Sequence, residues 1–131
     1  MVVETITLSS KAKEQLIQAK RYTGIEHWNV LCRWAFLLSL AEHTVPPAIK
    51  IPADSNVEMT WKIFGGQYHE LFEAILKERC LQDDLGTSQE TLATQFRLHL
   101  HRGISYLTAN RALGSISDLI SLALPKDNSN T

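Results

Sequence analysis

The sequence predicts a mainly α-helical protein built as one compact domain. Apolar residues recur at helical spacing in four long stretches, and serine, threonine or glycine marks where several of these stretches begin or end. Only two short stretches alternate between apolar and polar residues as strands do. At 131 residues, with 44% apolar and 21% charged residues, the chain has the size and composition of a single domain. We expect one helical domain over residues 1–125 and a disordered tail at residues 126–131.

Residues 1–42 are predicted to form a strand followed by two helices. Residues 3–8 read VETITL, which alternates and is rich in β-branched side chains, so they predict a strand. A Ser-Ser pair then supplies an N-cap for a helix over residues 11–22, and Gly24 ends that helix. The next helix, over residues 26–42, is apolar nearly all round. A small monomer has little with which to cover such a helix, so we expect a partner chain to bury it.

The middle of the chain is predicted to form a loop, a second strand and a helix. Residues 43–55 contain three prolines and must form a loop. Residues 57–63 alternate like a half-buried strand and are followed by a Gly-Gly pair. Residues 67–82 carry apolar side chains at helical spacing and predict a helix.

Two further helices are predicted in the last third of the chain. A capping box that begins at Thr87 opens a helix with apolar residues at regular spacing over residues 92–107. Gly103 lies inside this helix, where it marks a kink or a close helix contact. A second capping box, from Ser115, precedes a short helix that ends near Pro125.

The side chains able to do chemistry form no recognisable catalytic site. His69 and Glu73 are four residues apart, a spacing more typical of a solvated helix face than of a metal site. His99 and His101 point to different faces of one helix and cannot easily share an ion. Cys32 lies in an apolar helix, where packing explains it better than nucleophilic chemistry. We therefore expect a protein that is not an enzyme and has neither a metal site nor a cofactor.

Cysteine usage and the N-terminus predict a cytoplasmic protein. Cys32 and Cys80 belong to no CxxC or Cys/His cluster, so we expect both thiols to be buried and reduced. The N-terminus shows no basic segment followed by an apolar one, as a signal peptide would. The most apolar run, residues 30–41, is too short to span a bilayer, so no membrane partner is expected.

The order of elements in residues 1–42 is that of a ribbon-helix-helix protein. In that architecture two chains pair their strands into a ribbon that enters the DNA major groove, and their second helices pack together. The predicted ribbon face here carries Val3, Thr5 and Thr7, which offer no bidentate contact to bases. Contact with the DNA backbone is therefore favoured, and a transcriptional regulator of the ribbon-helix-helix type remains the alternative.

Positive charge is concentrated near the N-terminus although the net charge of the chain is −1. Residues 1–40 hold five basic and three acidic side chains. Four of the basic residues lie on or beside the polar side of the first predicted helix: Lys11, Lys13, Lys20 and Arg21. We take these four as candidate contacts to DNA phosphates. Composition alone favours the other interpretation, in which they simply form a solvated helix face.

The chain as a whole resembles the DndE family, small proteins of the bacterial DNA phosphorothioation system. The residues that carry the resemblance are the segments TITLSSKAKEQL, WNVLCRWAFLLSL, WKIFGG and FRLHLHRGISYL. None of these segments is diagnostic alone, but together they extend over most of the chain. The resemblance implies a component of the machinery that replaces a non-bridging phosphate oxygen with sulphur.

The resemblance also implies partners and site residues. It implies a homo-oligomer, a tetramer, that binds duplex DNA through the backbone without base specificity and prefers nicked duplex. It implies association with other proteins of the phosphorothioation complex, in which a separate cysteine desulfurase and an iron–sulphur protein handle the sulphur. Of the four cations, Lys11, Lys13 and Lys20 are the positions carried over from the family as DNA contacts. An enzymatic role such as nicking ranks third, after the binding component and the transcriptional regulator.

Overall fold

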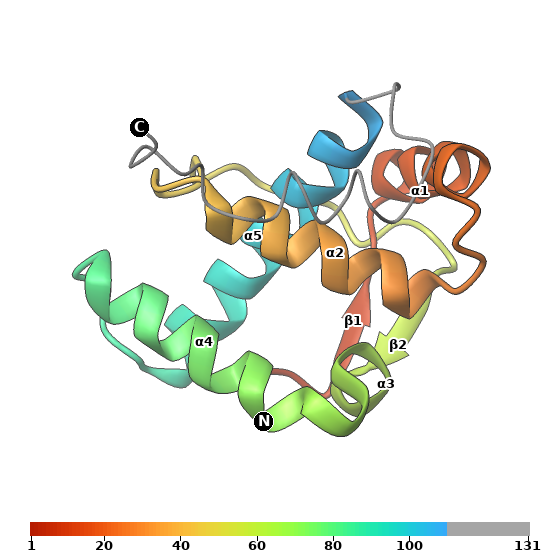
Figure 1. Ribbon diagram of the computed structural model, residues 1–131. Coiled ribbons are helices and arrows are strands. Elements are labelled where there is room, and N and C mark those ends of the chain that lie inside the picture. Colours follow the sequence, from red (N-terminus) through yellow and green to blue (C-terminus); the bar gives the residue numbers. More distant parts are fainter. Residues whose placement is uncertain (110–131) are drawn as a thin grey trace, which may run out of the picture.

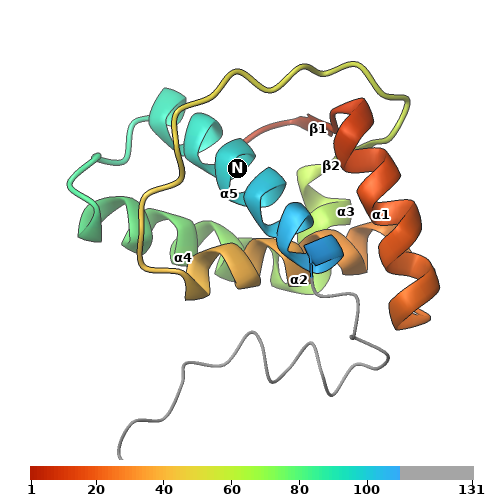
Figure 2. The same ribbon diagram turned by 90° about the horizontal axis from the view of Figure 1, so that it is seen from above.

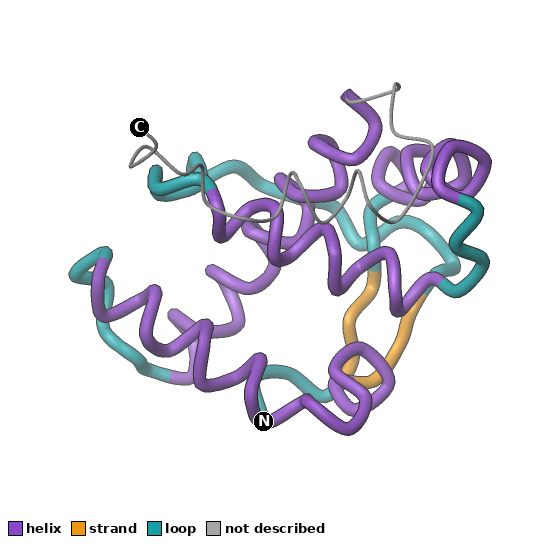
Figure 3. Tube along the Cα trace, in the orientation of Figure 1, coloured by secondary structure: helices purple, strands orange, loops and turns teal. Residues whose placement is uncertain are grey.

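The computed structural model describes residues 1–109, whose elements follow the predicted order (Figure 1). In chain order these are β1 (Thr5–Thr7), α1 (Ser10–Thr23), α2 (Trp28–Ala41), β2 (Glu58–Thr60), α3 (Trp61–Gly65), the 3-10 helix η1 (Gly66–Tyr68), α4 (His69–Gln82) and α5 (Gln89–Ala109). The mainly helical fold class is confirmed, since helices dominate the described chain and the sheet has only two short strands (Figure 3). The helix expected before Pro125 and the tail expected at residues 126–131 lie outside the described residues.

Helix α1 begins and ends as its sequence predicts. The Ser9 hydroxyl accepts a hydrogen bond from the backbone N–H of Ala12 at 3.0 Å and so satisfies one of the free amides at the helix start. Gly24 has a φ of 74°, and its N–H donates to the carbonyl of Lys20. Leu16 and the small residues at the same helical spacing are buried. The candidate cations lie outside this buried stripe, with Lys11 and Arg21 exposed and Lys13 and Lys20 half-exposed.

The two strands pair with each other inside one chain. β1 and β2 are antiparallel, with Ile6 opposite Met59 as the buried central pair. The N–H of Leu8 and the carbonyl of Glu4 continue the pairing on either side of β1. The ribbon-helix-helix order of elements is therefore present. In the architecture of that class, however, β1 would pair with a second chain, and here β2 occupies its hydrogen-bonding edge.

The second predicted strand is shorter than expected, because residues 61–63 are helical. The strand ends at Thr60, whose hydroxyl accepts a hydrogen bond from the N–H of Ile63 at 3.2 Å and caps α3. Trp61 is fully buried while Ile63 is 54% exposed, as expected for neighbouring residues on a short helix. The alternating pattern was misleading here, since a short apolar run can fit either structure until its cap is recognised.

Helix α2 packs against α5 of the same chain at very close range. A Cβ atom on Gly103 would lie 1.6 Å from the carbonyl oxygen of Ala35, so only glycine permits this approach. α5 therefore buries one side of α2 within the same chain, while the expectation that a partner chain covers the rest stays a prediction. A row on the outer side of α2 stays half-buried: Val30, Trp34, Leu37 and Ala41.

Helix α5 starts one residue away from the predicted cap. The sequence pattern predicts a capping box that begins at Thr87, but in the structure the hydroxyl of Ser88 accepts the N–H of Thr91 at 3.1 Å. Either hydroxyl fits the sequence pattern, and the observed helix begins at Gln89.

Aromatic side chains join four helices in the core. Phe36 of α2 contacts the rings of Phe64, Phe72 and Phe96, which come from α3, α4 and α5, at centroid distances from 5.3 to 6.0 Å. Trp61 lies against the same cluster, 5.0 Å from Phe96. Such tilted and edge-to-face contacts add to the free energy gained by burial. The proline-rich connection between α2 and β2 runs along the other side of α5 (Figure 2).

Candidate nucleic-acid interface

Lys13 and Lys20 lie on one side of α1. They are seven residues apart, which is close to two helical turns, so their side chains project from the same face. The ammonium group of Lys13 donates to the side-chain oxygen of Asn56 at 2.6 Å. The ammonium group of Lys20 lies 4.3 Å from the centre of the Trp28 ring, a cation–π contact. Both lysines are thus held by neighbours while they remain half-exposed.

Lys11 and Arg21 do not share that face. Arg21 is exposed and lies on the side of α1 opposite its buried residues. Lys11 is exposed on the far flank, where it lines a groove together with Lys50 of the connection between α2 and β2. The structure therefore divides the predicted set into two groups and adds Lys50, which the sequence reasoning missed. No periodic pattern surrounds Lys50, since it lies in a loop between prolines.

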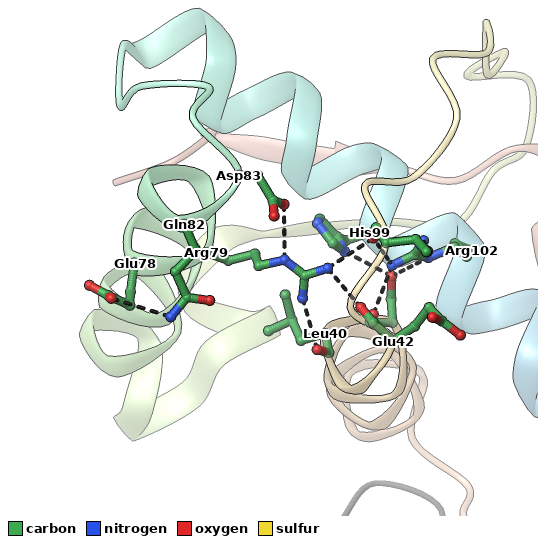
Figure 4. Close-up of polar contacts among 10 residues, drawn as sticks. Leu40, Glu42, Glu78, Arg79, Gln82, Asp83, His99 and Arg102 are labelled. Carbon is green, nitrogen blue, oxygen red and sulfur yellow. Dashed lines mark hydrogen bonds and ion pairs between the residues drawn. The ribbon is translucent and has the colours of Figure 1, made fainter. Parts of the chain in front are cut away.

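Two arginines close the C-terminal end of α2 instead of facing solvent (Figure 4). Arg79 of α4 donates to the carbonyls of Leu40, Glu42 and Thr44 at 2.7–2.9 Å and pairs with the carboxylate of Asp83. Arg102 of α5 donates to the carbonyls of Ser39 and Thr44, and also to their hydroxyls. These donors bind carbonyls of the last turn of α2, Ser39 and Leu40, and of the residues that follow it, and they place positive charge at the negative end of the helix.

Two other arginines also bind backbone carbonyls. Arg97 of α5 donates to the carbonyl of Thr7, next to the sheet, and to those of Ile51 and Pro52. Arg33 of α2 donates to two carbonyls of α3. These arginines therefore hold the fold together, and among residues 1–109 the exposed cations outside such contacts are chiefly lysines.

The outward face of the sheet is unsuited to reading bases. It carries Thr5, Thr7 and Thr60 together with Glu58, and Glu58 accepts a hydrogen bond from the Thr7 hydroxyl at 3.4 Å. A carboxylate on this face repels phosphate, and no arginine, lysine, asparagine or glutamine stands on it. This disfavours a regulator that inserts the ribbon into a major groove.

The two histidines of α5 have structural partners. His101 donates from Nδ1 to the carbonyl of Arg97 and accepts the N–H of Ser9 at Nε2, which fixes its neutral form. His99 is fully buried, with Nδ1 2.8 Å from the Ser39 hydroxyl. Burial lowers the pKa of each histidine to about 4, and the positive charge of Arg102 contributes at His99.

The other side chains that could take part in chemistry are two thiols with raised pKa values and a carboxylate held by ion pairs. Burial raises the pKa of the Cys32 thiol to about 12, and burial and the charge of Asp83 raise the pKa of Cys80. Glu73 contacts Lys77 at 3.1 Å and the N-terminal amine at 3.2 Å, and these contacts, the Lys77 hydrogen bond first, lower its pKa. Glu73 therefore has two cationic partners, neither of them His69.

Residues 1–109 contain neither a candidate metal site nor a candidate membrane span. In that part of the chain no three His, Cys, Asp or Glu side chains gather closely enough to hold a metal ion. None of its helices is long and apolar enough to cross a membrane.

Comparison of the sequence with models of protein families gives the family of this chain. The sequence model of the DNA sulphur modification protein DndE matches residues 5–115, which is most of the chain. The chain belongs to the DndE family. A search of curated proteins gave no match.

Two solved DndE structures have the same fold. Crystalline DndE from Escherichia coli B7A, described as involved in DNA phosphorothioation modification, is 26% identical, with a TM-score of 0.64. The match covers 82% of this chain and 99% of that one. A DndE mutant, described as involved in DNA phosphorothioation, is 21% identical and gives a TM-score of 0.61 over 81% of this chain and 99% of that one. The family assignment and the fold therefore agree.

Proposed function

We propose that this DndE-family protein is a non-enzymatic component of the phosphorothioation machinery that binds duplex DNA through its phosphate backbone. The observation that carries the proposal is the pair Lys13 and Lys20, held half-exposed on one face of α1 by Asn56 and Trp28. Ammonium groups contact phosphates without reading sequence. Exposed Arg21 on the neighbouring face of α1 adds to the same positive surface.

The proposed role includes no catalytic step for this chain. Both thiols have raised pKa values, which suppress the reactive thiolate, and both histidines of α5 are used as neutral structural groups. Sulphur transfer then belongs to other proteins of the machinery, and this chain holds the DNA and assembles with them. Its two described cysteines are unpaired and buried, which fits work on DNA in the reducing cytoplasm.

The binding form is proposed to be a homotetramer. The half-buried apolar row on the outer side of α2, which includes Trp34 and Leu37, offers a surface that a second copy would cover. Symmetry would repeat the α1 cations around the assembly and strengthen their combined field. Sedimentation equilibrium at micromolar concentration should give about four times the chain mass, and a mass near 14.8 kDa would contradict the proposal.

Charge reversal on α1 tests the DNA contact. Lys13→Glu and Lys20→Glu should each weaken binding to duplexes of every sequence alike. Each lost phosphate contact should also flatten the plot of log affinity against log salt by about one unit. Lys77→Glu on α4 is the matched control, since Lys77 is an exposed lysine engaged with Glu73. Unchanged affinity in the double α1 variant would show that the contact surface lies elsewhere.

Substrate preference is tested with matched duplexes. One sequence is prepared intact and with a single nick, and a scrambled sequence is prepared in both forms. The proposal expects tighter binding of both nicked forms and equal affinity for the two sequences. A strong preference for one sequence would instead favour the transcriptional regulator.

A further inference from the structure

A preformed groove lies on the side of α5 away from α2. Its volume is about 620 Å³, and three segments line it: the first turn of α1, the proline-rich connection, and α5. Its apolar lining includes Pro46, Ile49, Ile51 and Leu98. Ile49 is 65% exposed, which is unusual for a large aliphatic side chain. The groove therefore offers apolar surface that the described chain leaves uncovered.

The wall formed by the connection is fixed at both ends. Arg79 and Arg102 bind the carbonyl of Thr44 at its start. Near its end Arg97 binds the carbonyl of Pro52, and Asp54 accepts the N–H of Ser10 at 2.7 Å. The prolines between these points restrict the backbone further. A groove held open in this way loses little conformational entropy when it is filled.

The charge at the rim of the groove is positive. Lys11 and Lys50 line it, and no ion pair is formed by either lysine within the described residues. The carboxylate of Asp54, the acidic residue of the lining, accepts the N–H of Ser10, and the Ser10 hydroxyl donates to the main-chain carbonyl of Asp54. Apolar walls with a cationic rim suit a ligand that combines an apolar anchor with acidic neighbours.

We propose that this groove binds an extended acidic peptide segment of a partner protein, anchored by a large apolar side chain. The inference rests on the proposed role as an assembly component, and it gives that role a surface separate from Lys13 and Lys20. No phenylalanine, tyrosine or tryptophan lines the groove, and the ring of its histidine, His101, is held by hydrogen bonds to the backbone of Ser9 and Arg97, so the groove is a poor stacking surface for the bases of a nucleic acid strand. Prolines and aliphatic side chains favour a peptide side chain over a phosphate backbone.

The test uses the full chain and a fluorescent nine-residue peptide with a central Leu-Phe pair flanked by glutamates. Saturable binding is expected in the micromolar to millimolar range, and a peptide with lysines in place of the glutamates should bind at least about tenfold more weakly. Changes in amide NMR shifts should centre on the groove, around residues 46–52 and the facing turns of α5.

Matched variants separate the groove from the rest of the surface. Ile49→Ser removes an exposed apolar side chain without changing charge and should weaken peptide binding about tenfold, from lost apolar burial. Lys50→Glu should weaken it about fivefold at low salt and less at high salt. The controls are Leu81→Ser on α4, where Leu81 is 56% exposed, and Lys62→Glu on α3. Both controls should leave peptide affinity unchanged.

Each contrary outcome has a distinct meaning. No saturable binding up to millimolar peptide, equal loss in the control variants, or equal affinity for the lysine peptide would overturn the proposal. Displacement of the peptide by duplex DNA would reassign the groove to nucleic acid, and dissociation of the oligomer by the peptide would reassign it to a second copy. Ile49→Ser should leave DNA affinity intact, so a failure here is distinguishable from a failure of the proposed DNA binding.

Discussion

The arginines inside the molecule and the lysines on its surface divide the positive charge of this chain into two functions. Arg79 and Arg102 direct their planar donor groups at backbone carbonyls around the end of α2, and Arg97 does the same beside the sheet. Lys13 and Lys20 remain half-exposed on α1, each held by a single side-chain neighbour. Guanidinium groups suit fixed, multiple hydrogen bonds, whereas ammonium groups act as mobile point charges.

The division shows why net charge is a poor guide to the partners of this protein. The chain is slightly acidic as a whole, and Arg79, Arg97 and Arg102 are engaged in hydrogen bonds to backbone carbonyls of the fold. Charge available to an anionic ligand depends on which cations remain outside such networks. We call the carbonyl-bound Arg79, Arg97 and Arg102 the inner cations, and Lys13 and Lys20 the outer cations. Removing an inner cation should therefore lower the stability of the fold, and removing an outer cation should weaken DNA binding.

Arg79→Met should cause the largest loss. It would leave Asp83 without its partner and the carbonyls of Leu40 and Glu42 without their side-chain donor, at a cost of about 4 kcal/mol in the free energy of unfolding. Urea denaturation measures this, with Lys77→Met on the exposed side of the same helix as control. Equal losses in the two variants would remove the distinction between inner and outer cations.

Gly103→Ala should destabilise the contact between α2 and α5 without removing any charged group. The added methyl group would meet the Ala35 carbonyl at 1.6 Å, so α2 and α5 must move apart, which should cost about 3 kcal/mol. Thr94→Ala, at an exposed position of α5, is the control and should cost well under about 1 kcal/mol. Thermal unfolding compares the two, and a Gly103→Ala protein as stable as the control would contradict the close crossing.

Acid should destabilise the fold through the two histidines of α5. Their pKa is about 4 in the folded chain, against roughly 6.5 when unfolded, so unfolding takes up protons in this interval. Stability should be complete above about pH 6.5 and decrease as the pH falls toward 4. The expected loss between pH 7 and pH 5 is about 2 kcal/mol per histidine.

Substitution of His101 tests whether this histidine causes the loss of stability in acid. His101→Gln keeps an acceptor for the Ser9 N–H but cannot be protonated, so urea unfolding should show a smaller loss between pH 7 and pH 5. His43→Gln alters an exposed histidine and should keep the full loss. An unchanged pH dependence in His101→Gln would mean that other groups cause the acid effect.

The smallest effect on stability is expected for the outer lysines. Lys13→Gln and Lys20→Gln remove one side-chain hydrogen bond and one cation–π contact, so each should cost about 1 kcal/mol or less. Their DNA affinity should nevertheless fall, measured by fluorescence anisotropy at low salt. A large loss of stability, with DNA affinity unchanged, would place these lysines with the structural cations.

Local features of the sequence predicted much of the fold and part of the candidate site. Helix α1 was predicted from its cap at Ser9, the glycine that ends it and its apolar stripe. Each of these features depends on residues only a few positions apart, so the sequence alone is enough to predict them. The strand predicted over residues 57–63 failed at Trp61, where the cap at Thr60 and the aromatic core decided for a helix. The cations of α1 were found because they follow a helical pattern, while Lys50 follows none.

The sequence by itself determined the helical class, the order of strand and helices, and which side of α1 carries charge. The tertiary structure alone decided that α5 covers α2, that β2 pairs with β1, and that the arginines of α4 and α5 close the end of α2. The physical reason is the separation along the sequence of the residues that interact. Caps and helical periodicity depend on neighbours within one or two helical turns. The partners of Arg79, Arg97 and Arg102 lie tens of residues away, where only the folded chain brings donor and carbonyl together.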